Sequence, residues 1–238
     1  MHIGFGNRKE DAIMTVKEDI KSISRVLTFW DKLTDAQQNL ILDRIVTEKY
    51  QKGSTIHSGD MDCIGVLLIK KGEVRIYILS DEGKEITLYR LGEGEVCILS
   101  ASCILDNITF DVHIDAETDS EVLVIDSNVY KQICRQNIYA ESFTDKLVID
   151  RFSDVMWAME QILFMSFDKR LAIFLFDEIT RNQTDMIDLT HEQIAKYVGS
   201  AREVVSRMLK YFANEGIVEL SRGGVKVINK KKLKSLTL

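Results

Sequence analysis

The chain has 238 residues, of which 45% are hydrophobic and 29% are charged, and its formal net charge at pH 7 is −6. This length and apolar content are enough to bury a core and suggest about two domains. No run of about 18 consecutive apolar residues occurs, which excludes an ordinary membrane-spanning helix. The first residues lack the apolar centre of a signal peptide, so we expect a cytoplasmic protein without a membrane partner.

Four cysteines are scattered along the chain and form no Cys-x-x-Cys pair: Cys63, Cys97, Cys103 and Cys134. In a reducing compartment such thiols are most simply small buried hydrophobic groups. The sequence also lacks metal-ligand spacing, a phosphate-binding loop and a nucleophile–base arrangement. We therefore expect neither a metal site nor an enzyme.

Residues 50–125 alternate short apolar segments with glycines. The segments 66–69, 74–79, 86–91 and 121–125 are rich in residue types typical of strands, and residues 80–84 have the composition of a hairpin loop. Many short strands with glycine turns indicate a small antiparallel barrel or roll. Such a roll can enclose one small ligand or be filled by side chains, and the sequence leaves both open.

A long helix is predicted over residues 138–164. Apolar residues recur there at spacings of four, three, four and three, which is typical of a coiled-coil seam: Val148, Phe152, Val155, Met159 and Ile162. A second apolar row lies beside it, at Ile149, Met156 and Leu163. A single buried helix is the alternative, but two apolar faces fit better with one packed on the roll and one on a second copy. The pattern therefore favours a homodimer.

After a predicted bracing helix over residues 170–178, residues 189–212 indicate two short helices joined by a turn at Gly199. Thr190 with Gln193, and Ser200 with Glu203, have the spacing of capping boxes. The second helix carries an apolar stripe: Ala201, Val204, Val205, Met208, Leu209 and Phe212. These features predict a helix-turn-helix.

The opposite face of the second helix is polar, with Arg202, Glu203, Ser206, Arg207 and Lys210. Arginine pairs bidentately with guanine, and glutamate accepts from the amino group of cytosine. We therefore interpret this helix as a recognition helix. A charged face exposed only to solvent is the alternative, in which Glu203 would serve merely as a cap.

Residues 216–228 alternate like two short strands around Gly223 and Gly224, which predicts the hairpin of a winged helix-turn-helix. This hairpin would place Arg222 and Lys226 near the flanking phosphates. Residues 191–238 contain ten Lys or Arg and four Glu, a net charge of +6, so residues 1–190 carry −12. A basic end on an acidic body is typical of duplex binding. The lysine run 230–232 is either solvated or a further phosphate contact.

Roll, long helix and winged helix-turn-helix, in this order, resemble the family of the cyclic-AMP receptor protein and the fumarate-nitrate reductase regulator (Crp/Fnr). The resemblance covers about residues 24–228. Its most specific segments are IHSGDMDCIGVLLIKKGEVRIY (56–77), DEGKE (81–85), GEGE (92–95) and AREVVSR (201–207). It implies an α+β fold: an N-terminal antiparallel β-roll with a helical lead-in over 1–136, a dimerisation helix over 137–165, and a C-terminal winged helix-turn-helix over 166–238.

The resemblance also implies the biochemical role. Arg202, Glu203 and Arg207 match the residues with which the receptor protein reads its half-site, and Ser206 before Arg207 resembles the regulator branch. A homodimeric transcription regulator of this kind would bind an inverted repeat in double-stranded DNA and have RNA polymerase as a partner. The competing hypothesis is a regulatory subunit whose roll binds a ligand and whose C-terminal helices dock on a protein.

The candidate effector site departs from the sequence pattern of the nucleotide-binding members. Gly94 and Glu95 match the Gly-Glu turn, but Phe110 and Asp111 stand where those members have Arg with Ser or Thr around the cyclic phosphate. An aromatic ring and a carboxylate cannot replace a guanidinium on an anion. We therefore expect an unidentified small molecule or a redox change rather than cyclic AMP. The other candidate pocket residues are Cys97, Ser100, Ser102 and Cys103.

The cofactor is unknown from the sequence. Iron–sulfur relatives carry a cysteine cluster ahead of the roll, and no cysteine precedes Cys63, so no cluster is expected. A haem would need an axial ligand such as His57, His113 or Cys97, but a structural role is the simpler interpretation and we do not expect a haem. Oxidation of Cys97 and Cys103 would need thiolates of low pKa, and no cationic residue lies close in sequence, so core packing is again simpler.

Overall fold

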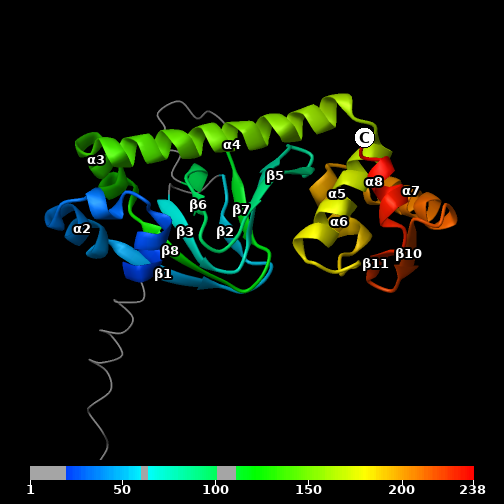
Figure 1. Cartoon of the computed structure of the whole chain (residues 1–238), viewed down its shortest axis with the longest axis horizontal. Helices are drawn as coiled ribbons and strands as arrows, with labels where there is room; N and C mark the ends of the chain where they lie inside the picture. Colours follow the sequence, from blue (N-terminus) through cyan, green and yellow to red (C-terminus); the bar gives the residue numbers. More distant parts are fainter. Residues whose placement is uncertain (1–19, 60–63, 101–110) are drawn as a thin grey trace, which may run out of the picture. The chain divides into compact units, whose positions relative to one another are not determined.

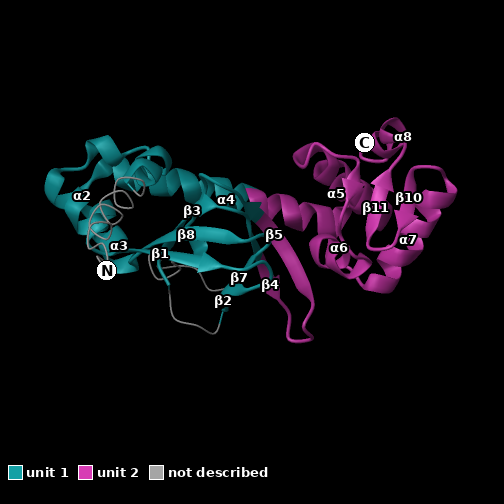
Figure 2. Cartoon of the chain, turned by 90° about the horizontal axis from the view of Figure 1, so that it is seen from below, with its two compact units in different colours: residues 1–76, 90–153 teal, residues 77–89, 154–238 magenta. Residues whose placement is uncertain are grey.

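The structure is a computed structural model that describes residues 20–59, 64–100 and 111–238. Two compact units divide the chain: unit 1 comprises residues 1–76 and 90–153, and unit 2 comprises residues 77–89 and 154–238 (Figure 2). Within the described ranges, no helix combines the length and the apolar character needed to cross a membrane.

Helical residues 20–26 precede the strands of unit 1, followed by the short helices η1 (Trp30–Lys32) and α2 (Asp35–Leu42) (Figure 1). A capping box starts α2: the Thr34 hydroxyl accepts from the amide of Gln37, and the Gln37 side chain accepts from the amide of Thr34. This pairing satisfies two amides that the first turn of a helix leaves without partners.

The β-roll consists of two four-stranded sheets. One sheet has the order β1 (Ile45–Tyr50), β8 (Ser120–Ile125), β3 (Val66–Lys71), β6 (Val96–Cys97). The other has the order β2 (Thr55–His57), β7 (His113–Ala116), β4 (Val74–Leu79), β5 (Glu85–Leu91). The pairs β1–β8, β3–β8, β3–β6 and β2–β7 are antiparallel. The predicted strands and the antiparallel roll are confirmed.

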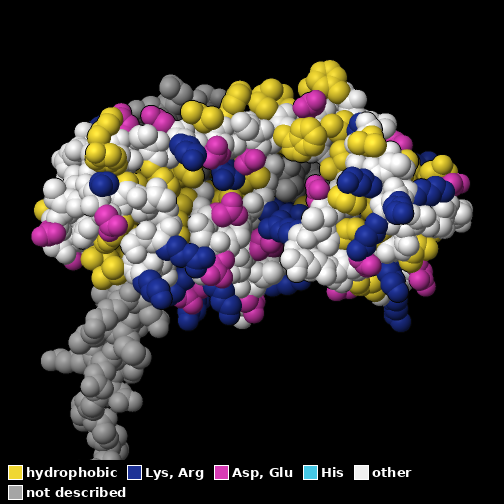
Figure 3. Space-filling model, in the orientation of Figure 1, with side chains coloured by type: hydrophobic (Ala, Val, Ile, Leu, Met, Phe, Trp, Pro, Cys, Tyr) yellow, Lys and Arg dark blue, Asp and Glu magenta, His cyan; other side chains and the backbone are white. Residues whose placement is uncertain are grey.

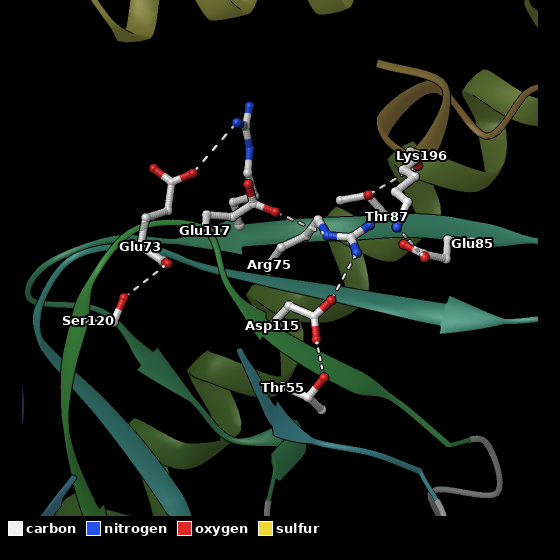
Figure 4. A network of polar contacts seen from close by, with 10 residues as sticks. Thr55, Glu73, Arg75, Glu85, Thr87, Asp115, Glu117, Ser120 and Lys196 are labelled. Atoms are coloured by element: carbon white, nitrogen blue, oxygen red, sulfur yellow. Dashed lines mark hydrogen bonds and ion pairs between the residues drawn. The ribbon is translucent and has the colours of Figure 1, made fainter. Parts of the chain in front are cut away.

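A buried arginine joins strands β2, β4 and β7 (Figure 4). Arg75 is 3% exposed, and its guanidinium lies 3.2 Å from a carboxylate oxygen of Asp115 and 3.1 Å from one of Glu117. The hydroxyl of Thr55 lies 3.1 Å from the second oxygen of Asp115. Two carboxylates therefore compensate one buried cation, as a buried charge requires.

Two consecutive helices follow the roll, α3 (Ser127–Gln136) and α4 (Ile138–Phe164). Asp126 caps α3 by accepting from two backbone amides, and the side chain of Asn137 accepts from the amides of Tyr139 and Ala140 at the start of α4. Asn137 itself is extended, with φ −138° and ψ 109°, which breaks one helix from the next. The predicted long helix is confirmed with the expected ends.

The remaining elements of unit 2 are α5 (Phe167–Arg181), β9 (Met186–Ile187), α6 (His191–Val198), α7 (Arg202–Asn214), β10 (Val218–Ser221), β11 (Gly224–Val227) and α8 (Lys230–Ser235). The strands form a sheet of order β10-β11-β9. Apolar side chains from the helices and the sheet bury one core, which includes Leu171, Leu175, Ile187, Ile194, Val205, Leu209, Phe212 and Val225. This core fixes the positions of α6 and α7.

The tip of the β4–β5 hairpin, residues 77–89, belongs to unit 2. Nζ of Lys196 on α6 lies 2.8 Å from a carboxylate oxygen of Glu85, and the hydroxyl of Thr87 donates to the carbonyl oxygen of Lys196 over 3.3 Å (Figure 4). No local sequence pattern predicts these contacts, because the partners lie more than a hundred residues apart.

Candidate nucleic-acid interface

The first helix of the pair begins and ends as the sequence predicts. The hydroxyl of Thr190 accepts from the amide of Gln193, whose side chain accepts from the amide of Thr190 in return. Gly199 ends α6 in the left-handed region, with φ 61° and ψ 48°, and its amide donates to the carbonyl of Ala195. A residue with a side chain would be strained there, so glycine allows the tight turn into α7.

The second helix begins one residue later than the predicted capping box requires. Ala201 is the N-cap, without a side-chain hydrogen bond, and α7 starts at Arg202. The amide of Ser200 instead donates to the carbonyl of Ala195 over 3.0 Å, so Ser200 completes the end of α6. The predicted Ser200–Glu203 capping box is therefore wrong. Glu203 is exposed and makes no capping bond, so its carboxylate does not serve as a cap of α7.

The two faces of α7 separate as expected, except that Ala201 of the predicted apolar stripe precedes the helix and is exposed. Val205, Leu209 and Phe212 are buried in the core of unit 2. Arg202, Glu203, Arg207 and Lys210 are exposed, and within the described residues none of these three cations forms an ion pair. Their charge is available to an anionic partner.

The lysines of α8 are placed differently. Nζ of Lys230 lies 2.5 Å from a carboxylate oxygen of Asp185, and Nζ of Lys232 lies 2.8 Å from one of Glu215. These two members of the lysine run are already partly neutralised within unit 2. They are weaker candidates for phosphate contacts than the cations of α7.

Ser206 has a partner that the sequence did not indicate. Nδ1 of His191, the first residue of α6, lies 2.8 Å from the hydroxyl oxygen of Ser206, and both side chains are half-buried. Burial lowers the pKa of His191, and the nearby cations Arg202 and Lys210 lower it further. Fifteen residues separate the two partners. No local pattern in the sequence could have singled out His191.

The wing is the hairpin of β10 and β11. Ser221 pairs with Gly224, so the two-residue turn is Arg222–Gly223, one residue earlier than the sequence suggested. Gly224 instead lies within β11, where a Cβ would stand 2.9 Å from the carbonyl oxygen of Ile187 on β9. Arg222 and Lys226 are exposed on this hairpin.

A cleft of about 350 Å³ lies between the wing and the starts of α6 and α7. It is lined by Leu189, Thr190, His191, Glu192, Arg202, Ser221, Gly223 and Gly224. Figure 3 shows Lys and Arg side chains, in dark blue, gathered over the part of unit 2 that holds α7, α8 and the wing. The helix-turn-helix and the wing thus present cations beside an open groove.

Large apolar side chains are exposed along α4. In the predicted seam, Phe152 is 65% exposed, Met159 is 46% exposed and Ile162 is also exposed, whereas Val148 and Val155 are half-buried. The second row, Ile149, Met156 and Leu163, is exposed as well. Figure 3 shows hydrophobic side chains, in yellow, along the edge of the view where Figure 1 draws α4. Such a contiguous apolar surface is typical of a protein–protein contact.

The candidate effector residues of the GEGE turn (92–95) lie at the surface of unit 1. Gly94 and Glu95 are exposed, and a carboxylate oxygen of Glu95 accepts from the amide of Gly92 over 2.7 Å. Asp111 is also exposed and lies directly beside Gly59. Ser102, Cys103 and Phe110 lie outside the described residues.

Cys97 and Ser100 lie in the interior of the roll. The hydroxyl oxygen of Ser100 lies 2.7 Å from the carbonyl oxygen of Gly65 and 3.0 Å from that of Cys97. Burial raises the pKa of the Cys97 thiol, which disfavours the reactive thiolate. Both side chains contribute to the packing of the roll.

Comparisons with known proteins match both parts of the chain. Residues 47–137 match the cyclic nucleotide-binding domain, and residues 169–236 match the Crp-like helix-turn-helix domain. The chain is 26% identical to the cyclic AMP receptor protein of Thermus thermophilus over 82% of this chain and 89% of that protein. It is 25% identical to the cAMP-activated global transcriptional regulator CRP of Haemophilus influenzae over 76% and 85%, respectively.

A crystal structure from Eubacterium rectale, of a transcriptional regulator assigned to the crp/fnr family, is 48% identical to this chain. The match covers 88% of this chain and 97% of that one, with a TM-score of 0.85. The likeness therefore extends through the β-roll, the long helix and the winged helix-turn-helix. The chain belongs to the Crp/Fnr family of DNA-binding transcription regulators.

Proposed function

We propose that the protein is a homodimer that recognises an inverted repeat in double-stranded DNA, with α7 of each copy in a major groove. The observation that carries this proposal is the exposed face of α7, where Arg202, Arg207 and Lys210 form no ion pair with any described residue. The two recognition helices of such a dimer must stand about 34 Å apart to enter successive grooves.

The residues of the interface divide by the chemistry of their side chains. Arg202 and Arg207 suit guanine, and Glu203 suits the amino group of cytosine. Ser206 lies between them in the sequence of α7 and can exchange hydrogen bonds with a base edge. Lys210, together with Arg222 and Lys226 of the wing, suits the phosphates. We assign base reading to the first group and positioning on the duplex to the second.

The seam of α4 supports the homodimer. Burying exposed apolar side chains such as Phe152 and Met159 against a second copy would remove them from water, which is the main favourable term in protein association. The functional domains we assign are the β-roll with its lead-in over 1–136, the dimerisation helix over 137–165 and the DNA-binding domain over 166–238.

The β-roll is proposed to sense an unidentified small molecule or a redox change, with RNA polymerase as the further partner. Cyclic AMP is not the proposed effector, although the Thermus thermophilus relative is a cyclic AMP receptor protein and the Haemophilus influenzae relative a cAMP-activated regulator. Asp111 is exposed at the position where an anion-binding residue would be needed, and its carboxylate would repel a phosphate. The remaining polar candidates are Glu95 and Ser100, with Gly94 and Cys97 beside them in the chain.

Selection of duplexes from a random pool by the full-length protein tests the proposal. An inverted repeat with a G·C pair in each half-site is expected, and equal binding of selected and random duplexes would contradict it. The salt dependence of binding counts the phosphate contacts.

A melting assay tests the exclusion of cyclic AMP. A ligand at about 100 times its Kd stabilises the folded state by about 2.7 kcal/mol, which raises the melting temperature measurably. Because we expect cyclic AMP not to bind, millimolar cyclic AMP should leave the melting temperature unchanged. A clear upward shift would show that Asp111 is not at the phosphate position.

A further inference from the structure

His191 and Ser206 connect the two helices of the helix-turn-helix through one polar contact. Nδ1 of His191 lies 2.8 Å from the hydroxyl oxygen of Ser206. His191 also lines the cleft between α6, α7 and the wing, beside Arg202. The imidazole ring therefore touches a proposed base-contacting group while part of it stays open to the side from which DNA would approach.

The state of the ring decides what Ser206 can offer to a base. A serine hydroxyl has one hydrogen, which turns to suit its partner, and two acceptor lone pairs. When Nδ1 of His191 carries no hydrogen, Ser206 donates to the ring and can only accept from DNA, which suits the amino groups of adenine and cytosine. When Nδ1 carries a hydrogen, Ser206 accepts from the ring and can donate to guanine, to N7 of adenine or to O4 of thymine, whereas the major-groove edge of cytosine offers no acceptor.

Protonation removes the choice between these two states. A neutral imidazole carries its hydrogen on either nitrogen, whereas the imidazolium carries hydrogens on both. Ser206 beside an imidazolium must therefore accept from the ring, and its own hydrogen is directed elsewhere. Below the pKa of His191, only the donor state of Ser206 remains available to a base.

The charged groups around the ring oppose this protonation in the free protein. Arg202 and Lys210 of α7 disfavour the imidazolium, as does burial. Glu192, the next residue of α6, lines the same cleft and favours it, and the wing residues of the cleft, Ser221, Gly223 and Gly224, carry no charge. DNA phosphates that pair with the two cations would offset their repulsion, so binding of a duplex favours uptake of a proton by the ring.

We infer that His191 is a positioning residue for base recognition, which acts through the Ser206 hydroxyl and makes one base preference of α7 depend on pH. The inference rests on the proposed function, because it requires α7 to read DNA. At low pH the position read by Ser206 favours guanine, adenine or thymine over cytosine. At higher pH the same position also accepts cytosine.

The test uses the full chain and duplexes that carry each of the four base pairs at every half-site position of the selected operator. Competition binding at about pH 5 and about pH 8, on either side of the ordinary imidazole pKa, compares a more protonated ring with the neutral ring. At one position, the preference for guanine, adenine or thymine over cytosine should be roughly twofold to tenfold greater at the lower pH, the range of one net hydrogen bond. The other positions serve as internal references. Unchanged ratios at every position would overturn the inference.

Two variants identify the groups responsible. His191→Asn keeps a hydrogen-bonding side chain that does not titrate, and Ser206→Ala removes the hydroxyl, so both should lose the pH-dependent preference. Ser235→Ala, at an exposed position of α8, is the matched control and should retain it. A preference that still changes with pH in both His191→Asn and Ser206→Ala would overturn the inference.

The outcomes also separate this inference from the proposed function. Circular dichroism of each variant distinguishes misfolding from loss of recognition, and either of the two variants suffices if the other does not fold. Selective binding of the operator at both pH values, without a change in base preference, contradicts only the role of His191. A wild-type protein that does not distinguish the operator from random duplexes at either pH contradicts the proposed function itself.

Discussion

Removal of the Phe152 ring should weaken the dimer strongly. Complete burial of a Phe side chain contributes about 1.5–3 kcal/mol. Phe152 is 65% exposed in a single chain, so burial of that part in the seam would contribute about 1–2 kcal/mol per copy. Two copies enter each dimer, and Phe152→Ala should therefore cost about 2–4 kcal/mol, or about 30-fold to 1,000-fold in the dissociation constant.

Sedimentation equilibrium over a range of protein concentrations measures this constant. Val46→Ala is the matched control, because Val46 is 55% exposed on β1, outside α4, and its replacement should leave the constant unchanged. The double substitution Phe152→Glu and Met159→Glu should give monomers, since each carboxylate would enter an apolar seam without a partner. A Phe152→Ala protein that dimerises as tightly as the wild type would refute the assignment of the seam.

Four further substitutions probe DNA binding and stability. Arg207→Ala should cost about 1–3 kcal/mol on the selected operator and relax the preference at one position, as measured by fluorescence anisotropy. Lys226→Ala should weaken all duplexes alike and reduce the salt slope by about 1; selective weakening would argue for base contact instead. Arg75→Met should lower the free energy of unfolding in urea by about 3 kcal/mol, because Asp115 and Glu117 would keep their charges without the guanidinium. Gly224→Ala should lower the melting temperature, since its Cβ would stand 2.9 Å from the carbonyl oxygen of Ile187; an unchanged melting temperature would contradict this packing.

Features that depend on neighbouring residues could be predicted from the sequence. The apolar spacing of residues 138–164 predicted a helix that the structure shows over the same residues. The Thr190–Gln193 capping box and the left-handed Gly199 were equally accessible, because both involve hydrogen bonds or dihedral angles within a single turn. The polar face of α7 also follows directly from helical periodicity.

Features that depend on distant contacts could not be predicted in this way. Ser200 has the spacing of an N-cap, yet its amide is held by the carbonyl of Ala195, and this bond at the end of α6 delays the start of α7. The strand β9 has only two residues and exists because it pairs with β11. Arg75 gave no signal, because its partner Asp115 lies forty residues away.

The membership of the β4–β5 tip in unit 2 has a practical consequence for work on the DNA-binding part alone. A fragment that begins at α5 would omit residues 77–89, so Lys196 would lose the carboxylate of Glu85. The turn at Gly199 would also lose Ile86, whose Cγ1 lies 3.7 Å from the position that a Cβ atom would take if Gly199 carried a side chain. The DNA affinity measured for such a fragment would be that of a helix-turn-helix whose turn is exposed to solvent where Ile86 covers it in the full chain. A fragment that keeps these contacts would have to include the hairpin residues 77–89, joined to the C-terminal part of the chain by an engineered connection.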